Sequence, residues 1–399
     1  MNGFRYTAGM VIWLWGGWVW SVHAAGSDTS LAVWSHFAEE RVFPRENRTF
    51  VGGYGEVVYT RLLDGSAAAD VEFRRFIIFL DHYFNSWVSF QSELELEHGS
   101  ELALEQAFLE MRVRPYLQIR SGLLLVPMSI INLYHEPTYF PTIYRPFLDR
   151  YLIPSTWREF GVGLAGYFRF GLKYYAYLLA GMNSETMVGS SFVRKGRQGG
   201  GKLKGNAAGN GRVIVNQPAV TLRLDYSTPV AGLQVGAAVY RSGLDNRKDG
   251  IKTGSVLTLV SLNASYQHMA WELTGQWVAG FLSRVDQINR VNQLTPENAL
   301  AARATGYNVS VAFDLLSLRS TPTSIQLLPF YMFEKLNLHD RIPATAVKNG
   351  AYNSYHHRMG LVFKPAENAV YKLEYRISGT ELPEDVPRIY VQLGVGYNF

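Results

Sequence analysis

From about Thr49 to the last residue, apolar and polar side chains alternate along the chain with a period of two. In the segment 87–97, Glu93, Glu95 and Glu97 share one face while the opposite face is apolar. Alternation of this kind predicts β-strands with one dry and one wet face. In a soluble sheet the wet face would meet outside water, whereas in a transmembrane barrel it would meet water in the lumen.

The same alternation recurs in segments of about ten residues, the length of a tilted strand that crosses a bilayer. These segments are 107–114, 117–125, 220–226, 271–281, 307–315, 358–364 and 371–377. In 71–84 and 170–181 apolar residues occupy both faces, so the alternation does not decide which face of these strands points to the lumen. The 24 Tyr, 22 Phe, 9 Trp and 37 Gly fit many half-wetted strands better than the continuous apolar strands of an α/β enzyme.

Short and long connections alternate between these segments. Seven tight turns are expected near 85–86, 114–115, 169–171, 228–232, 268–269, 316–323 and 365–369. Eight other connections, most of them longer, lie at 62–70, 98–100, 127–157, 182–215, 242–253, 282–303, 338–354 and 379–387. Seven turns and eight loops join sixteen strands, and an even number returns both chain ends to one side. We therefore predict an all-β fold, a transmembrane antiparallel up-and-down barrel of about sixteen strands over residues 49–399.

The first 24 residues are predicted to be a signal peptide. Arg5 precedes an apolar run from Ala8 to about Val22, and Val22-His23-Ala24 fits a cleavage site. A transmembrane anchor is the alternative, although the run is shorter than the ~20 residues of a spanning helix. We expect residues 25–48 to form a periplasmic segment before the barrel.

The chain ends on a strictly alternating strand whose last residue is Phe399. This ending resembles the assembly signal of outer-membrane proteins. We therefore expect the barrel-assembly machinery, outer-membrane lipid and lipopolysaccharide as partners, and the bacterial outer membrane as the location.

Several motifs together resemble porins of the phosphate-selective porin O and P superfamily. They are Gly122–Pro137 (GLLLVPMSIINLYHEP), Tyr144-Arg-Pro146, Ile153–Gly161 (IPSTWREFG), and Phe73-Arg74-Arg75 followed by Trp87. The resemblance implies a passive diffusion channel for small hydrophilic solutes or ions, assembled as a homotrimer. Phosphate selectivity is not implied, because no run here maps onto the arginine ladder of the phosphate-selective members.

The connection 127–157 is too long and too apolar to lie exposed in water, and five prolines stiffen it. We expect it to fold into the barrel as a constriction loop; a lid packed over the rim is the alternative. Its side chains available to line the narrowest part are His135, Glu136, Arg145, Asp149 and Arg150.

Charges on the wet face set the selectivity of a pore. The clearly alternating strands carry eight basic and eight acidic residues on that face. The pore-lining candidates are Arg112, Arg114, Arg120, Glu110, Glu93, Glu95, Arg223 and Glu159. This balance of charges predicts that the pore passes anionic or neutral solutes, with at most a mild preference for anions.

The glycine-rich connection 182–215 adds a basic mouth loop, whose cations include Arg194, Lys195, Arg197, Lys202 and Lys204. Held over the mouth, these cations would concentrate anions by electrostatic focusing. Binding the anionic sugars of the outer leaflet and simple solvation are the other two interpretations.

Other functions have little support in the sequence. A net charge of +5 without a block of Lys and Arg argues against nucleic acid, and the absence of Cys excludes a thiolate metal site. Gly161-x-Gly163-x-x-Gly166 matches a dinucleotide fingerprint, but a strand follows it where a helix is needed, so no cofactor is expected.

The pair His356-His357 beside Ser354 could suggest a hydrolase. Adjacent histidines on a strand point to opposite faces, and the sequence identifies no orienting acid. No spacing suggests a metal site. We therefore expect a channel rather than an enzyme, with a non-conducting structural or surface-binding barrel as the alternative and a barrel hydrolase third.

Overall fold

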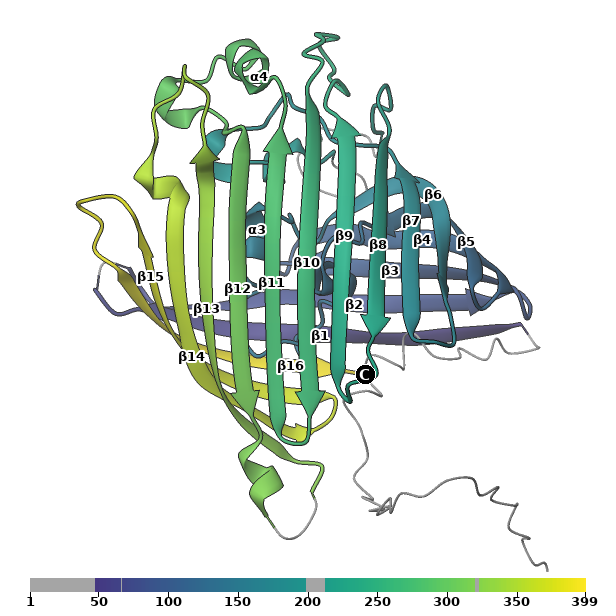
Figure 1. Cartoon of the computed structure of the whole chain (residues 1–399). Coiled ribbons are helices and arrows are strands. Elements are labelled where there is room, and N and C mark those ends of the chain that lie inside the picture. Colours follow the sequence, from purple (N-terminus) through teal and green to yellow (C-terminus); the bar gives the residue numbers. More distant parts are fainter. Residues whose placement is uncertain (1–46, 66, 199–211, 320–322) are drawn as a thin grey trace, which may run out of the picture.

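The computed structural model describes residues 47–65, 67–198, 212–319 and 323–399. The expected signal peptide, and all but the last two residues of the expected periplasmic segment, lie outside these ranges. In the described part, sixteen antiparallel strands form one sheet that closes where β1 pairs with β16 (Figure 1). The predicted fold class is therefore confirmed.

The strands vary from eight to sixteen residues in length. Their bounds are β1 (Arg48–Leu62), β2 (Asp70–Tyr83), β3 (Val88–Glu97), β4 (Glu101–Arg114), β5 (Leu117–Leu125), β6 (Arg158–Tyr167), β7 (Leu172–Leu179), β8 (Ala219–Ser227), β9 (Leu233–Gly243), β10 (Val256–His268), β11 (Trp271–Leu282), β12 (Arg303–Phe313), β13 (Gln326–Arg341), β14 (Asn353–Ala366), β15 (Ala369–Thr380) and β16 (Arg388–Asn398).

Short helices occur only in the connections of the described residues. They are α2 (Ile130–Leu133), α3 (Leu148–Tyr151), α4 (Val285–Val291), η1 (Gly189–Ser191), η2 (Arg194–Gly196), η3 (Pro296–Asn298), η4 (Leu315–Leu318) and η5 (Gly350–Tyr352). Among the described residues we find no helix with the length and apolar character needed to cross a membrane.

The two faces of the barrel wall differ as the alternation predicts. On the outer face Leu109, Leu222 and Leu373 are 44%, 42% and 46% exposed. Their neighbours Glu110 and Glu374 point inward and are buried. An apolar outside and a polar inside are typical of a barrel that spans a membrane.

Long connections gather at one end of the barrel, where α4 lies, and the C-terminus lies at the other (Figure 1). The link between β12 and β13 departs from the predicted tight turn. It contains η4, whose start is capped by the Asp314 carboxylate accepting hydrogen bonds from the backbone N–H of Leu316 and Leu327. This hydrogen bonding stabilises a longer connection at the end of the barrel where the short turns lie.

Two β-bulges change which side chains point inward. Arg74 is the extra residue where β2 pairs with β1, and Glu105 is the extra residue where β4 pairs with β3. A bulge turns the side chain of the extra residue to the face opposite to the one that the alternation predicts. As a result Arg74 and Arg75 both reach the carboxylate of Glu56, at 3.1 and 2.7 Å.

The apolar core lies inside the barrel, between the wall and two connections that fold inward. Trp157 and Leu148 come from the connection after β5, and Phe192 from the connection after β7. They pack with wall residues such as Tyr240, whose ring centroid lies 4.5 Å from that of Trp157. Part of the lumen is therefore filled by protein.

Candidate functional site in the barrel interior

The segment 127–157 is held inside the barrel by carboxylates of the wall. Glu334 of β13 accepts hydrogen bonds from the backbone N–H of Phe147 and Leu148, at 2.8 and 2.6 Å. Glu374 of β15 accepts one from the backbone N–H of Ile143, at 2.7 Å. These partners sit within the strands rather than at the rim, so the segment folds into the barrel and is not a lid over it.

Cations of the wall satisfy carbonyl groups of the same segment. The Lys372 ammonium donates to the carbonyl oxygens of Phe140 and Thr142, at 2.6 and 2.9 Å. Arg358 Nη1 donates to the carbonyl oxygen of Tyr144, at 2.9 Å. Buried backbone groups without a regular partner need such donors. Some of the basic side chains of the barrel wall therefore hold the infolded segment in place.

Glycines of β16 allow the segment to approach the wall. A Cβ on Gly394 would lie 2.7 Å from Ile143 Cδ1, which is closer than real Cβ atoms come. A side chain at this position would force the buried Ile143 side chain to move, so the glycine helps the segment to lie against the strand.

A cavity of about 1470 Å³, which we name the outer cavity, lies at the end of the long connections. Ten basic and six acidic side chains line it. The basic ones are Arg74, Arg75, Arg145, Arg150, Arg158, Arg194, Lys195, Arg197, Arg376 and Arg388. The acidic ones are Glu72, Glu95, Glu97, Glu101, Asp149 and Asp385. The excess of four positive charges gives this cavity an attractive potential for anions.

A smaller cavity of about 190 Å³, the inner cavity, lies toward the short turns. Its charged lining is Arg112, Arg120, Lys173, Asp81, Glu93, Glu110 and Glu136. The two cavities share no lining residue among those described, and the segment 127–157 contributes to both of them. The inner cavity has one more acidic than basic side chain, so the positive excess belongs to the outer one.

Arg120 organises the wall of the inner cavity. Its Nε donates to Glu110 at 2.7 Å, and its Nη1 donates to the hydroxyl of Tyr177 at 3.2 Å. The guanidinium also lies over the rings of Phe108 and Tyr175, at 5.4 and 5.7 Å from their centroids. Such stacking fixes the guanidinium without removing its charge.

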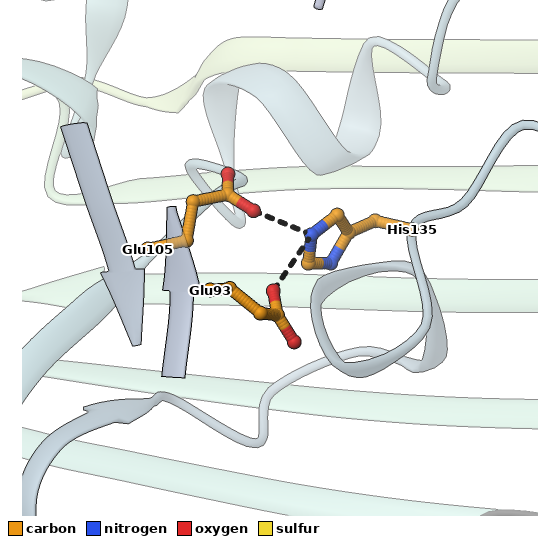
Figure 2. Close-up of side chains that lie close together, drawn as sticks. All are labelled: Glu93, Glu105 and His135. Carbon is orange, nitrogen blue, oxygen red and sulfur yellow. Dashed lines mark hydrogen bonds and ion pairs between the residues drawn. The ribbon is translucent and has the colours of Figure 1, made fainter. Parts of the chain in front are cut away.

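His135 connects the infolded segment to strands β3 and β4 of the wall (Figure 2). Its Nε2 lies 2.8 Å from a carboxylate oxygen of Glu105 on β4 and 3.8 Å from one of Glu93 on β3. Figure 2 shows both carboxylates directed at the same ring nitrogen. The two strands and the segment therefore bring three potential metal ligands together.

The described part of the basic mouth loop turns into the outer cavity. Arg197 is partly buried, and its Nη1 donates to the carbonyl oxygens of Pro154 and Thr156, both at 2.9 Å. Burial, together with the nearby charges of Arg158 and Arg194, lowers the pKa of Arg197 to about 10. Lys202 and Lys204 lie outside the described residues.

The remaining pore-lining candidates occupy different surroundings. Arg114 is exposed at the last residue of β4. Arg223 is buried and hydrogen-bonds Asp225. Glu159 is buried and accepts hydrogen bonds from the Trp157 indole and the Tyr240 hydroxyl, at 2.9 and 2.7 Å. Arg223 and Glu159 thus belong to the packed part of the interior.

The two adjacent histidines lie on opposite faces of β14, as the alternation predicts. His356 faces the interior, where its Nδ1 and Nε2 lie 2.9 and 3.3 Å from the hydroxyls of Ser378 and Ser354. His357 contacts the hydroxyl of Tyr331 at 2.8 Å. Serine hydroxyls therefore occupy both ring nitrogens of the interior histidine, including the one that a hydrolase would orient with an acid.

Glu105 is the functional candidate that the alternation missed. By parity it falls on the face of Leu109, which is exposed on the outer wall. The bulge turns it inward instead, where it is fully buried. A carboxylate on a lipid face is costly, so its presence at that parity was the signal for a bulge.

No family model matches the chain. The chain is 29% identical over 359 residues to a protein of Aquifex aeolicus described only as uncharacterized, covering 85% of this chain and 77% of the relative. The predicted resemblance to the phosphate-selective superfamily stays a prediction.

Solved structures share the fold at low sequence identity. An anion-selective porin from Comamonas acidovorans has a TM-score of 0.55 at 10% identity, with 89% of this chain and 100% of that chain covered. The outer-membrane channel DcaP of Acinetobacter baumannii gives 0.54 at 11%, covering 88% and 97%. OprB of Pseudomonas putida gives 0.56 at 8%, covering 94% and 96%. The fold is thus that of outer-membrane porin barrels, and at such identities the likeness establishes the fold alone.

Proposed function

We propose that this chain is a bacterial outer-membrane channel for passive diffusion of small hydrophilic solutes, with a mild preference for anions. The observation that supports it most is the outer cavity, where ten basic and six acidic side chains line a space of about 1470 Å³ inside a closed barrel. Low-dielectric walls focus this excess charge and raise the local concentration of anions.

The outer surface fits residence in a membrane. Near the short turns, the exposed rings of Tyr116 and Phe170 flank Phe168, with stacking distances of 6.1 and 5.4 Å. Trp271 packs on Phe313 at the same end. Aromatic belts at the boundary of an apolar band are typical of outer-membrane barrels. Export by the signal peptide 1–24 completes this proposal.

Phe399 supports the proposed role of the chain end in assembly. Its backbone N–H and C=O pair with Gly53 of β1, while the residue is 61% exposed on the outer face. The ring is thus accessible to the barrel-assembly machinery and then to lipid. A homotrimer and binding of lipopolysaccharide by the basic mouth loop belong to the same proposal, as does membership of the phosphate-selective superfamily.

A non-conducting structural or surface-binding barrel is the second candidate. It is favoured by the two cavities, because they share no lining residue among those described and the infolded segment borders both. The two candidates differ in whether solute can pass the segment 127–157 from one cavity to the other in the membrane.

Swelling of proteoliposomes separates these candidates. Vesicles loaded with an impermeant polymer and diluted into isotonic glycine, glucose or larger sugars swell only if the solute enters. We expect swelling with the smallest solutes and a steep decline with size, because the inner cavity measures about 190 Å³. Swelling no faster than in protein-free vesicles for every solute would reject the channel and favour the second candidate.

A further inference from the structure

The cluster of Glu93, Glu105 and His135 has the composition of a metal site. One oxygen from each carboxylate and one imidazole nitrogen lie within 4.8 Å of one another. Carboxylate oxygen and imidazole nitrogen together suit divalent first-row transition metals such as Zn²⁺. A nitrogen ligand is unusual for Ca²⁺ and Mg²⁺, which prefer oxygen alone.

Glu105 supplies a second, independent observation. Its side chain is 0% exposed, its Oε1 receives no hydrogen bond from an N–H or hydroxyl group within the described part of the chain, and its neighbour Glu95 is a second carboxyl group. Glu136, next to His135, is also buried with an oxygen that lacks a donor there. Burial of a carboxylate oxygen without a donor or a cation is strongly unfavourable. A bound cation would relieve this cost.

The surroundings orient the ligand atoms. The Gln106 amide donates a hydrogen bond to Oε1 of Glu93, which leaves Oε2 directed toward His135. The bulge at Glu105 turns that side chain out of the alternation and into the same space. Outer partners that fix the ligands are a regular feature of metal sites. Bulges likewise recur where a strand must re-aim one functional side chain.

The spacing fits a single ion after small side-chain movements. Metal–ligand bonds of about 2.0–2.2 Å place neighbouring ligand atoms roughly 3.0–3.5 Å apart. The Nε2 of His135 lies 2.8 Å from Glu105 and 3.8 Å from Glu93, on either side of that range. Glu93 and Glu136 line the inner cavity. This cavity gives an ion an entry path, and water in it can fill the remaining coordination positions.

We propose that Glu93, Glu105 and His135 bind one divalent transition-metal ion that fastens the infolded segment to strands β3 and β4. This site is independent of solute conduction. A barrel that conducts nothing can still bind the ion, and a channel can lack it, so the two proposals fail separately.

The test uses the purified full-length barrel in detergent, stripped with EDTA. Titration with Co²⁺, followed by its visible absorption, and with Zn²⁺, followed by calorimetry, should show one site per chain. Glu105→Gln keeps the shape of the side chain, and His135→Ala removes the nitrogen ligand. Each should weaken Co²⁺ and Zn²⁺ binding roughly tenfold or more. His98 lies beside Glu72 and Glu97 on the surface, so His98→Ala is the matched control and should leave the site unchanged.

The proposal is overturned if the unaltered chain binds neither ion. It is also overturned if Glu105→Gln and His135→Ala bind with unchanged affinity, which would leave a His–Glu ion pair. Folding of each variant is checked by circular dichroism and by the heat-modifiable mobility of the barrel. If His135→Ala does not fold, Glu105→Gln and Glu93→Gln decide the question.

Discussion

Gly396 of β16 faces Pro137 of the infolded segment so closely that a Cβ on Gly396 would lie 2.7 Å from Pro137 Cβ. Neither partner is the end of a flexible side chain, so the contact cannot be relieved by a rotamer change. The glycine is therefore part of what allows the segment 127–157 to cross the lumen.

The first prediction follows from this contact. Gly396→Ala should destabilise the barrel by about 1–3 kcal/mol, because the new methyl group displaces a stiff proline. Gly275→Ala is the matched control, since a Cβ there meets only one atom, at 3.8 Å. Thermal unfolding followed by circular dichroism measures both variants. Equal thermal unfolding midpoints for the two variants would mean that the segment does not lie against β16.

A second prediction concerns Glu334, which accepts two backbone hydrogen bonds from the start of α3. Glu334→Gln removes the charge and can accept with only one oxygen. It should lower the free energy of unfolding by about 1.5–3 kcal/mol, the value of a hydrogen bond to a charged group. The measurement is equilibrium unfolding in denaturant.

Glu381→Gln is the control for that change. Glu381 pairs with Lys335 and is half exposed, so its loss should cost less than about 1 kcal/mol. If both variants unfold alike, the carboxylate of Glu334 does not hold the segment.

The sequence predicts the barrel better than it predicts the interior. Strand number, faces and connections follow from alternation, because each side chain meets either water or an apolar medium. The segments 71–84 and 170–181 resisted assignment for physical reasons. In the first, the bulge at Arg74 shifts the parity; in the second, Tyr175 and Tyr177 face inward and pack around Arg120.

The interior contacts depend on pairs far apart in the chain. Nothing local to His135 indicates that it meets Glu105, and nothing local to Gly396 indicates Pro137. The length and apolar character of the segment 127–157 predict that it folds inward, but its partners on β13, β15 and β16 are set by closure of the barrel.

A third prediction addresses the charge of the outer cavity. Replacing both Arg194 and Lys195 by Gln removes two of its ten basic groups and should shift the zero-current potential in a KCl gradient toward zero. Arg197 is left in place because its hydrogen bonds hold the loop. The double control Lys252→Gln and Lys348→Gln removes two exposed cations of the long connections. A larger shift in the control would show that surface charge outside the cavity sets selectivity.

A fourth prediction is the pH dependence of the connection between β9 and β10. Although burial opposes it, hydrogen bonds from Thr253 and Gly254 hold the pKa of Asp245 below its usual range. A depressed carboxyl pKa stabilises the folded loop above the unfolded value of about 3.9, and that contribution is lost as pH falls through the folded pKa.

A spin label tests this directly, because the chain contains no cysteine. With a nitroxide on Lys252→Cys, the loop should stay ordered from pH 7 to about 4 and become mobile below that. Asp245→Asn should be mobile throughout, whereas Glu384→Gln should behave as the parent does. Unchanged spectra in Asp245→Asn would show that this carboxylate does not organise the loop.

The central claim is that solute crosses the barrel beside the infolded segment, and single-channel recording in planar bilayers tests it most directly. We predict discrete ohmic steps in KCl from the purified protein, with a zero-current potential that reports a mild anion preference. Bilayers that stay silent after insertion is verified, or steps that prefer cations, would contradict the account.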